Sequence, residues 1–164
     1  MMQIILLLPI FFSVVAQAPV LSKSEIIEPV CLKANVTEKQ RIVACAIEKV
    51  ARKRGFKSEH VIRGLIVNAF AESELNPNAI SPGHKSFGIF QLHVDGLGYK
   101  MSRKEMFDVE TSTNVIVDFM DEQNLNYNKM GEKQATRTIC STVLRPKDKK
   151  LKMKERVELL SKLF

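Results

Sequence analysis

An apolar helix that ends in a carboxylate is the feature that most constrains the fold of this 164-residue chain. Four residues recur at helical spacing and fall on one side of the predicted helix: Val61, Leu65, Ala69 and Glu72. Ser58 is a typical cap for its first turn, and Asn76-Pro77 is expected to end it, because the residue before proline disfavours helical backbone. The carboxylate of Glu72 therefore lies on the apolar face, one turn from the end.

The rest of the chain also has mostly helical periodicity. Thr37 and Gln40 have the spacing of a capping box at the start of a helix over 38–54. Further helices are expected from Asp108 or Thr111 onwards, near 132–143 and near 152–163. Residues 76–100 are rich in Gly, Pro, Asn and Ser, with room for a short turn or small hairpin near 88–93. The pattern predicts a mainly α globular domain with little or no sheet.

The composition suits one domain with its own core, because 45% of the 164 residues are hydrophobic. Residues 1–22 carry no charged side chain and contain a short apolar run followed by Ala16-Gln17-Ala18, a small-residue pattern that signal peptidases cut. We expect residues 1–22 to be a cleaved signal peptide or a retained apolar arm, and residues 23–164 to form the folded domain.

The chain is basic, with a formal net charge of +7. Much of the excess lies near the C-terminal end, in eight residues: Arg145, Lys147, Lys149, Lys150, Lys152, Lys154, Arg156 and Lys162. A solvated face of the last helix explains such a cluster, and so does a patch for an anionic partner. Cell-wall polymers, nucleic acid and anionic lipid all fit, so charge does not choose between them.

The three cysteines, Cys31, Cys45 and Cys140, include no Cys-x-x-Cys pair and have no zinc-binding spacing. We therefore expect no structural metal and no metal cofactor. In an exported chain Cys31 and Cys45 are candidate disulfide partners, and buried or unpaired thiols are the alternative.

The Glu72 carboxylate has two physical interpretations. On an apolar helix face it is costly unless paired or protonated, so it is either half of a buried ion pair or a functional acid. Glycoside hydrolases commonly use two carboxylates, but the nearest second candidate, Asp95, is weakly placed, and Glu74 follows too closely to share the same face. One carboxyl suffices where the acetamido group of the sugar is the nucleophile and the carboxyl acts first as acid and then as base.

Two motifs resemble those of a known family. Residues 72–81 resemble the Glu-Ser motif of the lytic transglycosylases, members of the lysozyme superfamily related to goose-type lysozymes, and residues 86–92 resemble their Gly-Leu-Met-Gln motif. Asn114 is similar in placement to an asparagine that opens a later helix in that family, and 96–101 resembles versions found in phage-associated members.

The resemblance implies a lysozyme-like fold and an enzyme that cuts peptidoglycan between N-acetylmuramic acid and N-acetylglucosamine without a cofactor. It implies that Glu72 is the catalytic acid and base, and that the substrate-binding residues are Ser73, Ser86, Gln91 and Asn114. A lytic transglycosylase releases a 1,6-anhydro sugar, whereas a muramidase of the same fold transfers the sugar to water.

The chain departs from the family pattern in its last third. It has no Ala-Tyr-Asn-Ala-Gly motif, which usually supplies a tyrosine that supports the acid, and Lys85 stands where a glycine usually precedes Ser86. Tyr99 or Tyr127 could support Glu72 only if the fold brings one of them close.

The resemblance and the apolar arm together predict an exported protein, periplasmic or virion-associated, that opens the wall locally for phage entry or for an envelope-spanning machinery. Its expected partners are peptidoglycan strands and other virion or secretion-apparatus proteins, and no specific nucleic acid. Two alternatives are a non-catalytic glycan-binding or structural virion component of the same fold, and a nucleic-acid-binding protein, which only the basic tail suggests.

Overall fold

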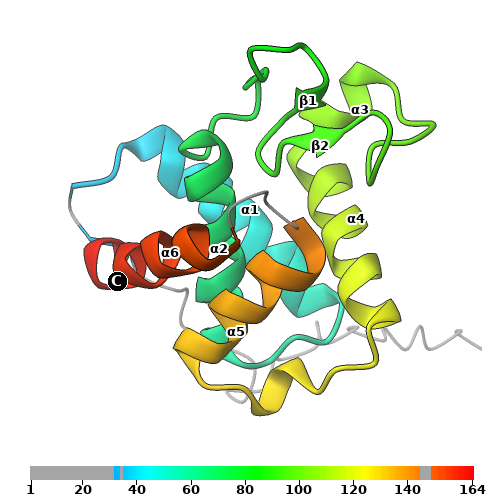
Figure 1. Cartoon of the computed structure of the whole chain (residues 1–164). Coiled ribbons are helices and arrows are strands. Elements are labelled where there is room, and N and C mark those ends of the chain that lie inside the picture. Colours follow the sequence, from blue (N-terminus) through cyan, green and yellow to red (C-terminus); the bar gives the residue numbers. More distant parts are fainter. Residues whose placement is uncertain (1–31, 34, 145–148) are drawn as a thin grey trace, which may run out of the picture.

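The structure, a computed structural model, describes residues 32–33, 35–144 and 149–164. Its elements in chain order are α1 (Glu38–Lys53), α2 (Glu59–Ser73), β1 (Ser86–Phe87), β2 (Leu92–His93), α3 (Arg103–Phe107), α4 (Val109–Glu122), the 3-10 helix η2 (Tyr127–Lys129), α5 (Glu132–Thr138), the π-helix η3 (Ile139–Leu144) and α6 (Lys149–Leu163) (Figure 1). The predicted mainly α fold with little sheet is confirmed. The expected signal peptide or arm at 1–22 lies outside the described residues.

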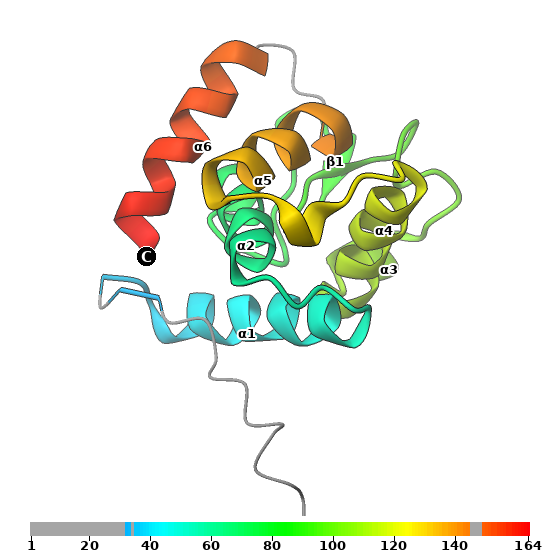
Figure 2. The ribbon, with the colours of Figure 1, turned by 90° about the horizontal axis from the view of Figure 1, so that it is seen from below.

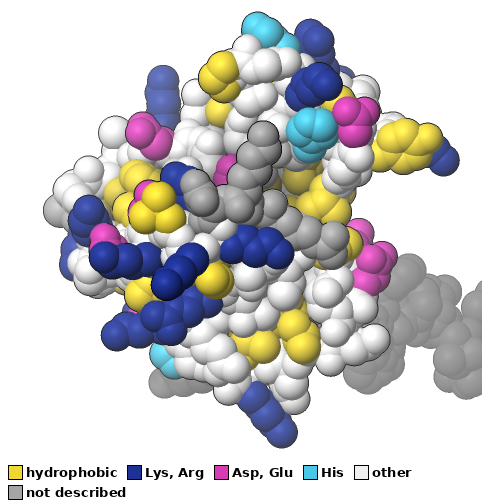
Figure 3. Space-filling model, viewed as in Figure 1, with side chains coloured by type: hydrophobic (Ala, Val, Ile, Leu, Met, Phe, Trp, Pro, Cys, Tyr) yellow, Lys and Arg dark blue, Asp and Glu magenta, His cyan; other side chains and the backbone are white. Residues whose placement is uncertain are grey.

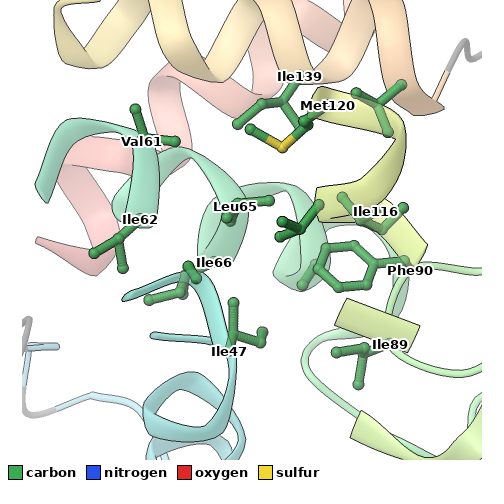
Figure 4. Close-up of a cluster of buried hydrophobic side chains, with 14 of the residues drawn as sticks. Ile47, Val61, Ile62, Leu65, Ile66, Ile89, Phe90, Ile116, Met120 and Ile139 are labelled. Atoms are coloured by element: carbon green, nitrogen blue, oxygen red, sulfur yellow. The ribbon is translucent and has the colours of Figure 1, made fainter. Parts of the chain in front are cut away.

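Helix α2 forms the centre of the molecule. It packs against α1, α5 and α6, which surround it in two perpendicular views (Figures 1 and 2). Apolar side chains of α2 are fully buried and meet residues of α1, α4 and the segment before β2 (Figure 4). Burying one such side chain contributes roughly 1.5–3 kcal/mol. The helix that carries Glu72 is therefore held firmly on several sides.

Two predicted helix starts are confirmed in detail. Thr37 and Gln40 form the capping box of α1. Asp108 caps α4, and its carboxylate accepts hydrogen bonds from the hydroxyl (2.6 Å) and the N–H (2.8 Å) of Thr111. These bonds lower the pKa of Asp108, because they stabilise its charged form.

Helix α2 ends at Ser73, earlier than the predicted stop at Asn76-Pro77. Glu74 and Leu75 take left-handed backbone conformations, with φ of 55° and 60°. This turn returns Leu75 to the core, where it is 2% exposed, and the burial of that side chain accounts for the early stop. Ser58 occupies the N-cap position, but its side chain makes no capping hydrogen bond.

The expected small hairpin is present. Strand β1 pairs with β2 in antiparallel fashion, with Ser86 opposite His93. Gly88 turns the chain with φ of 76°, and a Cβ atom there would overlap the carbonyl oxygen of Met106 at the end of α3. Helix α3 was not predicted, although Ser102 and Glu105 form a capping box at its start.

Helix α6 begins at Lys149, before the predicted start near 152, and it also differs from its prediction in the burial of one residue. Its lysines are exposed, and basic side chains gather over α6 in Figure 3. Arg156, however, is only 2% exposed and shares the buried face of α6 with Leu160 and Leu163. The prediction of a solvated basic face is therefore wrong for Arg156, while Arg145 and Lys147 lie outside the described residues.

Two described cysteines are free thiols: Cys45 is exposed and Cys140 is buried. Cys31, the candidate partner of Cys45, lies outside the described residues. Burial raises the pKa of the Cys140 thiol. No helix in the described part of the chain has the length and apolar character to cross a membrane.

Because the hairpin lies so close to α3, we expect Gly88→Ala to destabilise the protein strongly. The substitution forces alanine into left-handed backbone and against the Met106 carbonyl, so we expect a loss of at least about 2 kcal/mol in the free energy of unfolding. Urea denaturation followed by circular dichroism measures it. Gly83→Ala is the control, because nothing lies within 4 Å of its Cβ position. Equal stabilities of the two variants would contradict the predicted overlap.

Candidate active site

A pocket of about 450 Å³ opens at the end of α2. Ten residues line it: Glu72, Phe90, Gln91, Leu92, His93, Gly96, Leu97, Phe119, Val143 and Leu144. They come from the end of α2, the hairpin and the loop after it, α4 and η3. On the face shown in Figure 3, the surface is hollowed between the part that carries the hairpin and the helical body, with hydrophobic side chains in the hollow. The pocket combines apolar walls with a few polar groups, as binding sites for organic ligands commonly do.

Glu72 is the sole carboxylate among the described residues that line this pocket. Its side chain is 22% exposed, and Nη2 of Arg156 donates a hydrogen bond to its Oε1 atom. Glu72 is thus one half of an ion pair and also a group that faces the pocket. The expected apolar surroundings of the carboxylate are interrupted by one guanidinium group.

A buried polar network stands behind this ion pair. Nη1 of Arg156 donates to Oδ1 of Asn68 at 2.6 Å, and Asn68 is fully buried one turn before Glu72 on α2. The amide nitrogen of Asn68 donates to the carbonyl oxygens of Gly64 (2.7 Å) and Thr136 (3.2 Å). Every hydrogen-bonding atom of the Asn68 side chain is occupied, so this side chain provides a fixed acceptor for Arg156.

The absence of a side chain at Gly64 supports this arrangement. A Cβ atom there would lie 3.2 Å from the backbone nitrogen of Thr136 on α5. Because Gly64 lets the two helices approach closely, the Thr136 carbonyl comes within reach of Asn68.

Two of the predicted substrate-binding residues fix the loop: Ser73 ties it to α2, and Gln91 makes its bonds within the loop. The Ser73 hydroxyl proton is shared between the carbonyl oxygens of Ala69 (3.1 Å) and Ile89 (2.9 Å), and thus joins the helix end to the hairpin turn. Gln91, with φ of 48°, donates its amide nitrogen to the carbonyl oxygens of Ala79 (3.3 Å) and Gly88 (3.0 Å). Gln91 lines the pocket together with Glu72, and its amide oxygen has no hydrogen-bond donor among the described residues.

The other two predicted binding residues do not line the pocket. Ser86 lies in β1, where its backbone N–H donates to Oγ of Ser81 at 3.1 Å. Asn114 lies on α4, where its amide oxygen accepts from Arg54 at 3.4 Å, across the contact between α4 and α1.

Neither tyrosine supports Glu72. Tyr99 is 67% exposed, and Lys100 lies over its ring. Tyr127 is buried against Phe56, and its hydroxyl lies 3.5 Å from Oγ1 of Thr142. Burial raises the pKa of the Tyr127 hydroxyl. The side chain that contacts Glu72 is Arg156 instead of either tyrosine.

His93, at the edge of the pocket, lies beside Asp95, which does not line it. His93 lines the pocket, and the N–H of Asp95 donates to its Nδ1 atom at 3.1 Å. The Asp95 carboxylate is 74% exposed and lies 3.9 Å from the same nitrogen. Within the described residues no group of three His, Cys, Asp or Glu side chains is placed to hold a metal ion.

Sequence reasoning missed Arg156 and the pocket wall formed by η3. Arg156 has the helical spacing of Leu160 and Leu163, so the pattern places it on the apolar side of α6. Because Arg156 also lies within a run of basic residues, we assigned it to the solvated face of the helix. The π-helix η3, which contributes Val143 and Leu144, is a rare form that often occurs at functional sites and has no simple sequence signature.

The comparisons with known proteins agree with this geometry. The family described as the transglycosylase SLT domain matches residues 49–141, which include the end of α1, all of α2 and the hairpin. Comparisons with curated proteins and with solved structures found no match. The match covers more than half of the chain, and the lysozyme-like helical fold is the one expected of that family. The chain belongs to the transglycosylase SLT domain family.

Proposed function

We propose that this chain is an exported lytic transglycosylase that cuts peptidoglycan between N-acetylmuramic acid and N-acetylglucosamine, with Glu72 as acid and base. The family assignment supports a peptidoglycan-acting function of the lytic transglycosylase type. The observation that carries the finer proposal is the placement of Glu72 as the sole carboxylate among the described residues lining a pocket inside the matched region.

One carboxyl can run both steps of this reaction. In the first step, Glu72 donates a proton to the glycosidic oxygen while the acetamido oxygen of the muramic acid residue bonds to C1, and the bond from C1 to the leaving sugar breaks. In the second step, the carboxylate takes the proton of the C6 hydroxyl as that oxygen bonds to C1 and displaces the acetamido oxygen. The product is the 1,6-anhydro sugar, and the carboxyl has its proton again.

The pocket walls suit a sugar chain. Leu97 and Phe119, which are partly exposed, offer apolar surface to the faces of sugar rings. The amide oxygen of Gln91, which has no donor among the described residues, can accept from an acetamido N–H group. Through its bond to Ile89, Ser73 is proposed to hold the loop that carries Gln91.

The setting is part of the proposal. We infer that residues 1–22 direct export or are kept as an apolar arm, that 23–164 form the catalytic domain, and that the protein acts in the periplasm or from a virion. There it opens the wall locally for phage entry or for an envelope-spanning machinery. The basic excess favours attraction to anionic wall polymers.

Glu72→Gln is expected to lower the rate of cleavage of purified peptidoglycan by about 100-fold or more, because the amide cannot transfer the proton. It also removes the charge that compensates buried Arg156, so the free energy of unfolding should fall as well. Turbidity of wall suspensions and thermal unfolding measure the two effects.

The neighbouring exposed carboxylate provides the control, because Glu74→Gln changes the same chemical group outside the pocket. It should keep wild-type activity. Asp95→Asn should also keep wild-type activity if Glu72 is the one carboxyl that the reaction needs. A folded Glu72→Gln variant that cuts walls at the wild-type rate would contradict the assignment.

The product distinguishes a transglycosylase from a muramidase. Mass spectrometry of digested walls should find 1,6-anhydro muramic ends, which are lighter than reducing ends by one water. Digests with only reducing ends would refute the transglycosylase and support the hydrolytic alternative. An inactive wild-type protein that still binds walls would support the non-catalytic alternative.

A further inference from the structure

We propose that Arg156 is a positioning residue for Glu72, supplied by a helix outside the part of the chain that matches the family. The match ends at residue 141, whereas Arg156 lies on α6 (Lys149–Leu163). This inference rests on the proposed role of Glu72 as acid and base. It adds that the active site is complete only when α6 is docked.

The guanidinium group bridges two residues one helical turn apart on α2. One terminal nitrogen donates to Oε1 of Glu72 and the other to Oδ1 of Asn68. The planar fork of arginine can make both bonds at once in a fixed geometry, which the single ammonium group of lysine does not reproduce. Since Asn68 is held by two carbonyl oxygens, the guanidinium is fixed, and so is the carboxylate oxygen that it contacts.

Packing alone does not account for an arginine at this position. The Arg156 side chain is 2% exposed, and its Nε atom has no partner among the described residues. Burying a charge is costly, and an apolar residue of similar size often packs equally well or better. The arginine is therefore better explained by what it does to Glu72 than by its contribution to the core.

Helix α6 is anchored so that it can hold this geometry. Leu160 and Leu163 form a small apolar cluster with Val36 and with Val67 of α2. The N–H of Lys33 donates to the carbonyl oxygen of Leu163 at 2.9 Å, near the end of the helix. Arg156 lies one turn before Leu160 on the same face, so docking of the leucines brings the guanidinium to Glu72.

Fixing one oxygen of Glu72 orients the other. A free glutamate in an open pocket samples several conformers, and each reaction cycle would have to select one of them. With Oε1 held from inside the protein, Oε2 has no donor among the described residues and is available to the glycosidic oxygen. Such preorganisation lowers the barrier, and a displacement of about 1 Å can cost roughly 100-fold in rate.

The test is the kinetics of Arg156→Met and Arg156→Lys on soluble uncrosslinked peptidoglycan strands. We expect Arg156→Met to lower kcat by about 10- to 100-fold with KM nearly unchanged, because substrate contacts stay but the acid is no longer held. Arg156→Lys should recover part of kcat. Lys154→Gln is the control, since it removes the same charge from the exposed side of α6 and should behave as the wild type.

Folding is followed separately in the same variants. Two measurements report whether α6 stays docked: thermal unfolding and the rate at which Cys140 is labelled. Cys140 is buried in η3, which packs against α6. A folded Arg156→Met variant with wild-type kcat would overturn the inference, and so would a higher kcat, which would mean that Arg156 blocks the acid. A wild-type protein that does not cut the strands would contradict the proposed function itself.

Discussion

The contact between Arg156 and Glu72 joins helix α6 to the end of α2 that faces the pocket. Glu72 lies where the buried helix α2 reaches the pocket, and Arg156 is the only basic residue of α6 buried among the described residues. A buried cation requires partners, and α6 can pack as it does only because Glu72 and Asn68 supply them. The same pair that satisfies the charge of Arg156 thus includes the carboxylate that we propose as the acid.

Much of the fold could be predicted because it depends on local signals. The capping boxes, the helical stripes and the glycine-containing turn each act over a few residues, and α1, α4 and the hairpin follow them. Helix α3 was missed although its capping box is a local signal, but the end of α2 and the burial of Arg156 depend on distant parts of the chain. Helix α2 ends early because Leu75 packs into a core that other helices form. The local Asn76-Pro77 signal does not indicate this packing.

The residues of the candidate site also divide into those that local motifs identify and those that depend on distant contacts. Glu72 and Gln91 could be identified because they lie in two motifs close in sequence, and the structure brings both to one pocket. Arg156 is 84 residues away from Glu72 and stands within a run of lysines, so only the spacing to Leu160 hinted at its burial. The family pattern names a tyrosine for the supporting role, whereas this chain places a guanidinium next to Glu72. Under the proposed mechanism, a different chemical group then holds the acid in this chain.

The central claim is that the carboxyl held by Arg156 is the one that meets the scissile bond. A crystal structure of the wild-type protein with a glycan analogue that has sulfur in place of the glycosidic oxygen would test it most directly. The account predicts the sulfur within hydrogen-bonding reach of Oε2 of Glu72, the flanking sugars against Leu97 and Gln91, and the Arg156 contact to Oε1 intact. A glycan seated away from Glu72, or a Glu72 side chain that leaves Arg156 to meet the sugar, would contradict it.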